Sequence, residues 1–460
     1  MASTYLSRTP SSNSASRTAI TFSVWLKRSN LGALQTIFHT STSNSGYIYF
    51  AMNANDQVDF SLQNNDFSSS APTGFKERKI TNRRLRDVNA WYHIVCTIDT
   101  TLATTTDRLK IYINGERETS WSHETNNTQQ SQALPSLIGS TSHAYNIGRQ
   151  GNNSYFYDGS MTHFHYVDGT AYQASTFGET DSTTGIWKPK TSPTVTHGTN
   201  GFFLKFENSA AMGTDSAGSN NFAVNGTMTK LIDTPSNVFA CLNAVLGTRT
   251  GSNGNVMALS NGSTTMESSD SAWRAAQTTL AVSSGKYYCE LKFKVTGSGT
   301  VYAGIWSMDD FLASSSTIGD IANGVSYNLN TGQYSNAGSL ASYGDAFSAG
   351  DILGIAIDLD NNKAYFARNG TWQNSGVPTS GSTGTGALNI VANKTYAFGA
   401  SCNPTGSSSS HSWNFGNGYF GTTAVTSAQN PDDGIGIFEY DVPAGYRALC
   451  TKSINAQEYS

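Results

Sequence analysis

The sequence is poor in charged residues: Asp, Glu, Lys and Arg make up 13% of its 460 residues, and the formal net charge is −4. Proteins that bind nucleic acid through its phosphates carry a surplus of Lys and Arg. That surplus is missing here, so no nucleic-acid partner is expected. The one basic cluster, at residues 75–87, is interpreted as an exposed strand and loop.

Long apolar runs are also missing. No segment approaches the roughly 20 consecutive apolar residues of a membrane-spanning helix, so membrane insertion is not expected. Residues 1–29 contain no basic stretch followed by an apolar one, and the sequence therefore predicts no signal peptide. Long stretches rich in Ala, Leu, Glu and Lys are absent too, which argues against long helices.

Cysteine is scarce and scattered. The five cysteines are Cys96, Cys241, Cys289, Cys402 and Cys450. Their number is odd and no two of them form a C-x-x-C pair, so neither a disulfide framework nor a zinc site is expected. Cys96 and Cys289 lie in apolar strand patterns, where a free thiol acts as a small hydrophobic side chain. No cofactor is predicted.

Aromatic residues make up 11% of the chain and are separated by abundant Ser, Thr, Asn and Gly. This composition suits pleated strands joined by turns. AITFSVWLKR, for example, alternates and places Phe22, Val24 and Leu26 on one face. Such strands recur about every ten residues, and the length fits roughly two domains. We therefore predict an all-β fold of two tandem antiparallel β-sandwich domains of the jelly-roll type.

Two phrases far apart in the chain are nearly alike, RLKIYINGERE and KAYFARNGTWQ. In each, β-type residues lead into Asn-Gly, at Asn114-Gly115 and at Asn369-Gly370, and each follows an apolar run that ends in Asp. Asn-Gly is typical of two-residue type I′ turns, because both central residues need φ > 0. Each phrase predicts a hairpin, and their similarity indicates two domains of related architecture.

The two strand series are separated by small polar residues. The first series extends over residues 1–207, and the second over 237–460. Residues 208–236 between them are interpreted as a linker. The last part of the chain is expected to supply a C-terminal strap to the second domain.

Several motifs resemble known families. FSVWLKRS, WYHIVCTID, LKIYINGE and YFYDGSMTHFHYVDG are similar to the laminin-G/pentraxin-like branch of the concanavalin A-like lectin fold. KYYCELKF, VYAGIWS, GDILGIAIDLDNNKAYFARNG and WNFGN resemble a SPRY domain, which is a related two-sheet sandwich. The ordered set YLSRT, FGETDSTTGIWKPK, HGTNGFFLKF, LIDTPSN and PAGYRAL resembles virion proteins of tailed bacteriophages.

The resemblance to phage proteins implies a virion surface component, such as a fibre, knob or host-recognition subunit. Such a protein would be made in the host cytoplasm and placed on the virion. Its implied partners are other virion proteins and a host-surface glycan or protein. A homo-oligomer is compatible with this role, although no heptads indicate one. Two alternatives stay open: a decoration subunit without host binding, and a lectin-fold polysaccharide depolymerase.

Catalysis is not expected. Polysaccharide hydrolases place two carboxylates on either side of the scissile bond, but the E-x-D-x-x-E pattern of lectin-fold hydrolases does not occur. Glu179 and Asp181 lie in GETDS, which we interpret as a loop, and Asp358 and Asp360 are expected to solvate a turn. No G-x-S-x-G elbow is present either. No catalytic residue is assigned.

A metal site is not assigned. His163 and His165 share one face of an expected strand, and a His-x-His pair of this kind can bind a metal. Two imidazoles in an ordinary sandwich would give the same pattern. Neither DNNK nor PDDG follows a calcium-loop pattern, but the lectin-fold resemblance leaves calcium open.

Binding is the remaining function. Sugar recognition needs exposed aromatic faces with amide and hydroxyl groups beside them. The candidate binding residues, all expected in loops, are Trp121, Tyr155, Tyr157, Tyr343 and Trp372. The alternative for each is an aromatic residue that packs on its own domain.

Overall fold

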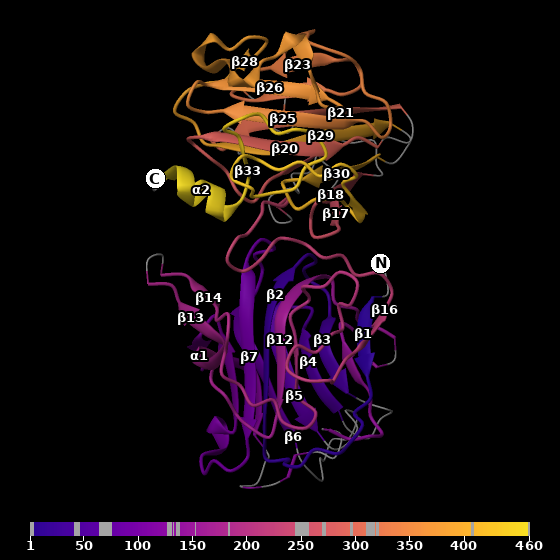
Figure 1. Ribbon diagram of the computed structural model, residues 1–460, viewed down its shortest axis with the longest axis vertical. Helices are drawn as coiled ribbons and strands as arrows, with labels where there is room; N and C mark the ends of the chain where they lie inside the picture. Colours follow the sequence, from indigo (N-terminus) through magenta and orange to yellow (C-terminus); the bar gives the residue numbers. More distant parts are fainter. Residues whose placement is uncertain are drawn as a thin grey trace. The chain divides into compact units, whose positions relative to one another are not determined.

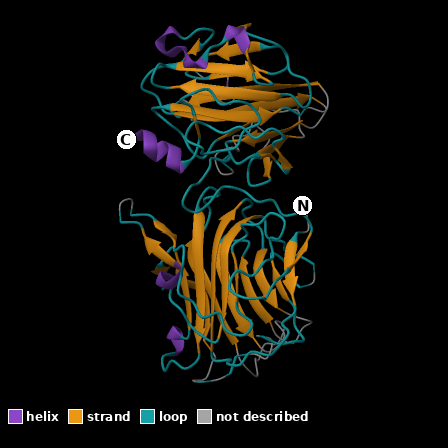
Figure 2. Ribbon diagram, viewed as in Figure 1, coloured by secondary structure: helices purple, strands orange, loops and turns teal. Residues whose placement is uncertain are grey.

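The computed structural model contains two compact units, Met1–Lys230 (unit 1) and Leu231–Ser460 (unit 2), and both consist mainly of strands (Figures 1 and 2). The structure describes residues 4–40, 47–63, 76–126, 131, 133–134, 139–151, 153–182, 185–243, 257–268, 273–294, 298–309, 318, 322–405 and 409–458. Within these residues, neither α-helix is long and apolar enough to cross a membrane.

Unit 1 is a sandwich of two antiparallel sheets in its described residues. The eight-stranded sheet has the order β10 (Trp121–Asn126), β6 (Lys76–Arg84), β5 (Gln57–Gln63), β4 (Tyr47–Met52), β3 (Gln35–Thr40), β11 (Tyr145–Ile147), β1 (Tyr5–Arg8) and β16 (Ala223–Asn225). The six-stranded sheet has the order β15 (Phe202–Leu204), β12 (Gly159–Asp168), β2 (Ala19–Arg28), β7 (Trp91–Asp99), β8 (Leu109–Ile113) and β9 (Glu116–Arg117). A short 3₁₀ helix, η1 (Thr105–Asp107), precedes β8.

The two sheets of unit 1 meet in an aromatic core. The ring of Phe22 on β2 lies 4.7 Å from that of Phe38 and 5.8 Å from that of Phe60, both on the opposite sheet. Val24 and Leu26 are buried in the same core. The predicted inward face of this strand is therefore confirmed.

A second apolar layer covers the outer face of the six-stranded sheet. It is formed by α1 (Ala174–Phe177) and by the hairpin of β13 (Gly178–Thr180) and β14 (Trp187–Pro189). The prediction of a loop was wrong for Glu179, which lies in β13, but it holds for Asp181, which follows the end of that strand. Both carboxylates face the ammonium of Lys188, at 3.9 Å from Glu179 and 2.7 Å from Asp181.

Unit 2 is also a two-sheet sandwich. Its nine-stranded sheet has the order β17 (Ala258–Ser260), β18 (Thr265–Ser268), β30 (Ser409–Asn414), β20 (Lys286–Lys292), β25 (Ile352–Asp358), β26 (Lys363–Arg368) and β27 (Thr371–Trp372), with β28 (Leu388–Asn389) on β26 and β33 (Arg447–Ala448) parallel to β20. The six-stranded sheet has the order β19 (Arg274–Gln277), β29 (Tyr396–Thr405), β21 (Ser298–Ser307), β22 (Val325–Asn328), β23 (Gln333–Asn336) and β24 (Ser339–Ser342). The predicted fold class is confirmed.

The remaining elements of unit 2 are short. They are the ladder of β31 (Tyr419–Phe420) and β32 (Thr423–Ala424), the 3₁₀ helices η3 (Gln373–Ser375) and η4 (Pro378–Thr383), and the helix α2 (Thr451–Glu458). The segment that carries Phe438 and Tyr446 packs on the outer face of the nine-stranded sheet, against Tyr288 and Tyr365. Asp358 is buried and forms an ion pair with Lys286 at 3.0 Å. Its carboxylate also accepts from the backbone N–H of Asn361 at 3.0 Å, so it serves the turn after β25 as predicted, but from a buried position.

The two Asn-Gly hairpins are confirmed and have the same hydrogen bonds. The side-chain oxygen of Asn114 accepts from the backbone N–H of His93 at 2.8 Å, and that of Asn369 accepts from Ile352 at 2.8 Å. In both hairpins the Asn backbone N–H donates back to the same residue. Each turn also lies under an aromatic ring from the segment that covers its sheet.

The boundary between the units differs from the predicted one. Residues 208–236 were expected to be a linker, but β16 pairs with β1 in the eight-stranded sheet. Phe222 is buried in the core of unit 1, and the Asp215 carboxylate accepts from the backbone N–H of Phe203 at 2.9 Å. Small polar residues misled the prediction, because their backbone still adds an edge strand.

Candidate functional site

A continuous row of polar side chains crosses the outer face of the eight-stranded sheet of unit 1. The residues in register are Ser7, Asn146, His39, Tyr49, Ser61, Arg78 and Thr125. We call them the polar row. Their strands come from segments separated by more than a hundred positions in the sequence, so only the sheet brings these side chains together.

The next row of the same strands faces the core and is apolar for most of its length. Its members in register are Leu6, Ile147, Phe38, Phe50, Phe60, Lys79 and Glu124. Successive side chains of a strand point to opposite faces of the sheet. The polar row therefore lies on the face turned away from the core. Lys79 and Glu124 end the inner row as an ion pair of 3.0 Å.

One end of the polar row is an amide–guanidinium–aromatic cluster. The guanidinium carbon of Arg149 lies 3.5 Å from the centre of the Tyr5 ring, and Arg149 Nε donates to Asn146 Oδ1 at 2.9 Å. His39 Nδ1 accepts from the backbone N–H of Gly151 at 3.2 Å. Burial lowers the pKa of His39 to about 4, so this imidazole is neutral at pH 7.

The other end of the polar row carries paired charges. Arg78 donates to both carboxylate oxygens of Asp59, at 3.1 Å and 2.7 Å. Between these ends, Ser61 Oγ is buried without a hydrogen-bond partner in the part of the chain that the structure describes. Thr36 Oγ1, on β3 two strands away, is in the same state among the described residues. An unpartnered buried hydroxyl is uncommon and marks a place where a polar ligand or water would add a bond.

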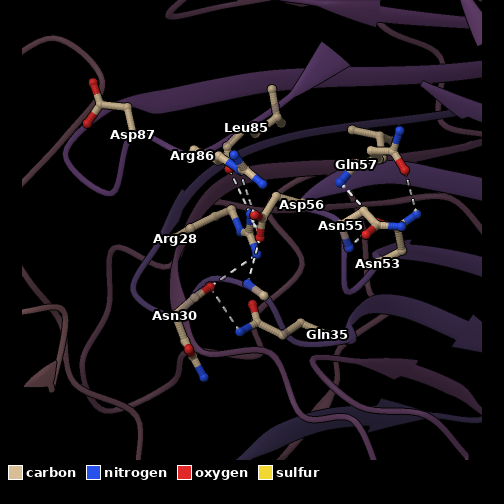
Figure 3. A network of polar contacts seen from close by, with 12 residues as sticks. Arg28, Asn30, Gln35, Asn53, Asn55, Asp56, Gln57, Leu85, Arg86 and Asp87 are labelled. Atoms are coloured by element: carbon tan, nitrogen blue, oxygen red, sulfur yellow. Dashed lines mark hydrogen bonds and ion pairs between the residues drawn. The ribbon is translucent and has the colours of Figure 1, made fainter. Parts of the chain in front are cut away.

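A polar network fixes the loops at one end of this sandwich (Figure 3). The buried guanidinium of Arg28 donates to Asp56 at 2.9 Å and to the carbonyl of Leu85 at 2.7 Å. Asp56 also accepts from the backbone N–H of Gly32 at 2.8 Å and from Arg86 at 3.0 Å. Burial alone would raise the pKa of Asp56, but these donors outweigh it and lower the pKa.

The same end of the sandwich holds the loop of Tyr155. The carbonyl of Tyr155 accepts from the backbone N–H of Thr36 at 2.8 Å, and the hydroxyl of Tyr157 donates to the carbonyl of Lys27 at 3.0 Å. Tyr155 is 48% exposed, as a loop residue available for binding would be. Tyr157 instead packs against the core, and burial raises its pKa.

The other three predicted binding residues are not exposed loop aromatics. Trp121 begins β10 and packs on the core of unit 1, with Lys79 Nζ 4.7 Å from its ring centre. Tyr343 is buried in unit 2, and Trp372 packs on an apolar cluster of the same unit. The loop expectation was wrong for Trp121 and Trp372, which lie in β10 and β27. Tyr343 does lie in a loop, but its ring packs in the core of unit 2. The five predicted residues do not converge on one site.

The polar row was not predicted from the sequence, because the candidate binding residues were all expected in loops. Its members lie within strands; Tyr49 in YIYFAM and Ser61 in QVDFSLQ, for example, alternate with core residues. The period-two alternation was therefore the available signal. It identifies outward residues of one strand, but not their neighbours in the sheet.

His163 and His165 do not lie on an undisturbed strand face, as the His-x-His pattern predicted. A β-bulge interrupts β12 between Thr162 and His165, and His163 has a φ of 47°. His165 Nδ1 lies 3.1 Å from His197 Nε2, and both rings stack near Phe203. Among the described residues, no group of three His, Cys, Asp or Glu side chains could hold a metal ion.

The fold agrees with one family model. Residues 2–175 match the model described as the concanavalin A-like lectin/glucanases superfamily. This match lies within unit 1, whose two-sheet sandwich is therefore similar to a concanavalin A-like lectin domain. No curated protein matches the chain.

Solved structures with similarity to parts of the chain include two SPRY domains and a pentraxin. The SPRY domain of human HERC1 has 13% identity and a TM-score of 0.26, over 33% of this chain and 87% of that one. Another human SPRY domain has 14% identity and a TM-score of 0.25, over 33% and 90%. The heptameric SAP-like pentraxin from Limulus polyphemus has 16% identity and a TM-score of 0.26, over 37% and 71%.

Proposed function

We propose that this chain is a non-enzymatic surface protein of a bacteriophage particle, as a fibre, knob or host-recognition subunit. The polar row of unit 1 would bind a glycan or protein of the host surface. The observation that carries the binding role is this polar row, which spans the outer face of one sheet. The virion role is supported by the ordered sequence phrases that resemble phage proteins.

The chemistry of the polar row suits a polyhydroxylated ligand. Sugar hydroxyls need donors and acceptors, while their apolar C–H faces pack on aromatic rings. Arg149, held by the buried amide of Asn146, supplies a guanidinium group at one end, and Tyr5 and Tyr49 supply partly exposed rings. Because strands hold these side chains in place, little conformational entropy is lost on binding.

The test compares two variants, Tyr49→Ala in the polar row and Arg149→Ala beside it, with a matched surface variant; the first two are called the row variants. Tyr49→Ala and Arg149→Ala each remove one ligand-facing group, whereas Ile186→Ala trims a side chain that is 54% exposed on β14's hairpin. The purified full chain is applied to host cells and to an array of bacterial capsular and lipopolysaccharide glycans. We expect about tenfold weaker binding or more for each row variant, which corresponds to roughly 1.4 kcal/mol, and unchanged binding for Ile186→Ala.

Two results would contradict the proposal in different ways. If both row variants bind like the unaltered protein, the binding site lies elsewhere. If the unaltered protein neither binds host cells nor blocks phage adsorption, the host-recognition role fails and a decoration subunit explains the chain better.

The proposal that the protein is not an enzyme is supported by the carboxylate groups near the polar row. Glycosidases use two carboxylates that are roughly 5–9.5 Å apart. Asp59 is the carboxylate beside the polar row in the described residues, and Arg78 binds both of its oxygens. The depolymerase alternative would be supported by release of new reducing ends when the protein is incubated with host polysaccharide.

A further inference from the structure

The strand β24 leaves one edge of unit 2 unpaired in the part of the chain that the structure describes. It is the last strand of the six-stranded sheet and pairs only with β23. All four of its residues are exposed, and Leu340 is 52% exposed. This strand therefore offers both a free backbone edge and an apolar side chain.

The backbone groups on this edge follow from the hairpin geometry. Ala337 and Gly338 form a two-residue turn with φ values of 50° and 82°. Such a turn makes its flanking pair a hydrogen-bonded one, and the pairs then alternate along the ladder. Further along, the backbone N–H of Tyr343 again donates inward, at 3.2 Å from the carbonyl of Gly332. The N–H and C=O of Leu340 and Ser342 therefore point away from β23.

The usual protection of an edge strand is missing here. Natural edges are commonly guarded by charged side chains, Pro or bulges. β9 carries Glu116 and Arg117, and β10 carries Glu124. Residues 321–344, which include β22, β23 and β24, contain no Asp, Glu, Lys, Arg or Pro. The pairing of β23 with β24 also shows no register shift.

We propose that β24 is a self-association edge on which a second copy of this chain pairs antiparallel across a two-fold axis at Ala341. This register places Leu340 opposite Ser342 of the second copy, so that all the outward N–H and C=O groups of both residues are satisfied. A two-fold axis at Leu340 would instead place Ser342 opposite Gly338 of the second copy. Gly338 lies in the turn, so only the N–H and C=O groups of Leu340 would then form hydrogen bonds between the copies. At the axis the two Ala341 side chains meet in a close, non-hydrogen-bonded pair that small residues suit.

The absence of charged residues from β24 favours a second copy of this chain as the partner that pairs with this edge. Across a two-fold axis, every charge near the centre faces its own copy, so a charged edge would repel itself. An uncharged edge has no such cost. The contact is small compared with the roughly 1,000 Å² of a stable interface, so the association is weak and depends on local concentration.

The test is sedimentation of the purified full chain over a wide concentration range, up to several hundred micromolar. Leu340→Lys places like charges beside the axis, and Ser342→Pro removes an outward N–H at an edge position that tolerates Pro. Val391→Lys makes the same charge change at a residue that is 46% exposed and outside the strands. We expect concentration-dependent dimerisation of the unaltered protein and of Val391→Lys, and at least tenfold weaker dimerisation of the other two.

The proposal has clear contrary outcomes. A protein that stays monomeric throughout the range overturns it, including the case in which this edge accepts a strand of a different protein. Dimerisation that Leu340→Lys and Ser342→Pro leave unchanged would place the interface elsewhere. Equal weakening by Leu340→Lys and Val391→Lys would show a general charge effect and would also overturn it.

Discussion

At the scale of single residues, Glu290 of unit 2 is a buried acid with four hydrogen-bond donors. It is fully buried, and its carboxylate accepts from the backbone N–H of Glu439 and Tyr440, both at 2.9 Å. Asn414 Nδ2 and the hydroxyl of Tyr288 also donate to it, each at 3.2 Å. Burial raises the pKa of Glu290 to about 7, although these donors act in the opposite direction. The carboxylate thus ties β20 to the covering segment.

Replacing this carboxylate with an amide is expected to destabilise unit 2. In Glu290→Gln the amide nitrogen cannot accept, so at least one buried backbone N–H loses its partner, at a cost of about 2 kcal/mol. The free energy of unfolding from urea titration measures the effect. Glu267→Gln, at an exposed position of β18, is the control and should be neutral. Equal stability of the two variants would contradict this account.

The same residue predicts a pH dependence. Its folded-state pKa of about 7 lies above the ordinary value of 4.5, so the folded state holds a proton that the unfolded state has lost in this window. The stability from this group is complete below pH about 4.5 and is lost as the pH rises to about 7. Buried His39 and His411 have lowered pKa values and act in the opposite direction.

The comparison with the variant isolates the contribution of Glu290. The unfolding free energy of the unaltered protein minus that of Glu290→Gln should fall as the pH rises from about 5 to about 7.5. Denaturant titrations at several pH values measure this difference. A difference that stays constant or grows over this range would contradict the raised pKa.

At the scale of elements, the two Asn-Gly hairpins are contact points for the segments that pack on the outer face of one sheet in each sandwich. Gly115 has a φ of 86°, and a Cβ built on it would lie 2.8 Å from the ring of Trp187. Gly370 has a φ of 77°, and its Cβ would lie 2.7 Å from the ring of Tyr440. Each position therefore requires glycine for two reasons. The turn needs a positive φ, and the aromatic ring leaves no space for a Cβ.

A matched pair of glycine variants distinguishes the cost of the positive φ from the cost of the clash with the aromatic ring. Gly115→Ala meets both the unfavourable φ and the Trp187 ring, whereas Gly32, with a φ of 71°, has open space at its Cβ. We expect Gly32→Ala to cost about 1 kcal/mol and Gly115→Ala about 2–4 kcal/mol of unfolding free energy. Thermal and urea unfolding of unit 1 measure both. Equal costs would show that Trp187 moves aside freely.

At the scale of the whole molecule, each unit has its own core and its own covering layer. The aromatic core and the outer cluster of unit 1 contain only residues up to 228, and those of unit 2 begin at 232. Independent cores predict independent folding. β16 and Phe222 place the end of the first folding unit after residue 225.

Expression of the separate units tests this boundary. Residues 1–230 and 231–460 should each unfold cooperatively in circular dichroism and calorimetry. A fragment of residues 1–207, which ends at the boundary predicted from sequence, lacks β16 and Phe222 and should melt roughly 10 °C lower than residues 1–230. Equal melting temperatures of the two fragments would show that the segment after residue 207 contributes nothing.

Sequence alone determined the features that depend on a few neighbouring residues. The alternation around Phe22 defines a strand and its inward face, because successive side chains point to opposite faces. Asn114-Gly115 and Asn369-Gly370 define their hairpins, because the turn constrains only its own dihedral angles. All-β architecture and two domains followed from the repetition of such local signals.

Tertiary structure alone decided which side chains meet. Asn146 lies beside His39 and Tyr49 only because β11 pairs with β3, across more than a hundred residues of sequence. The exposure of Tyr155 and the burial of Tyr343 depend likewise on what packs over each ring. Register and covering layers are long-range properties of the folded chain, so no local pattern of aromatic and polar residues could have placed the polar row.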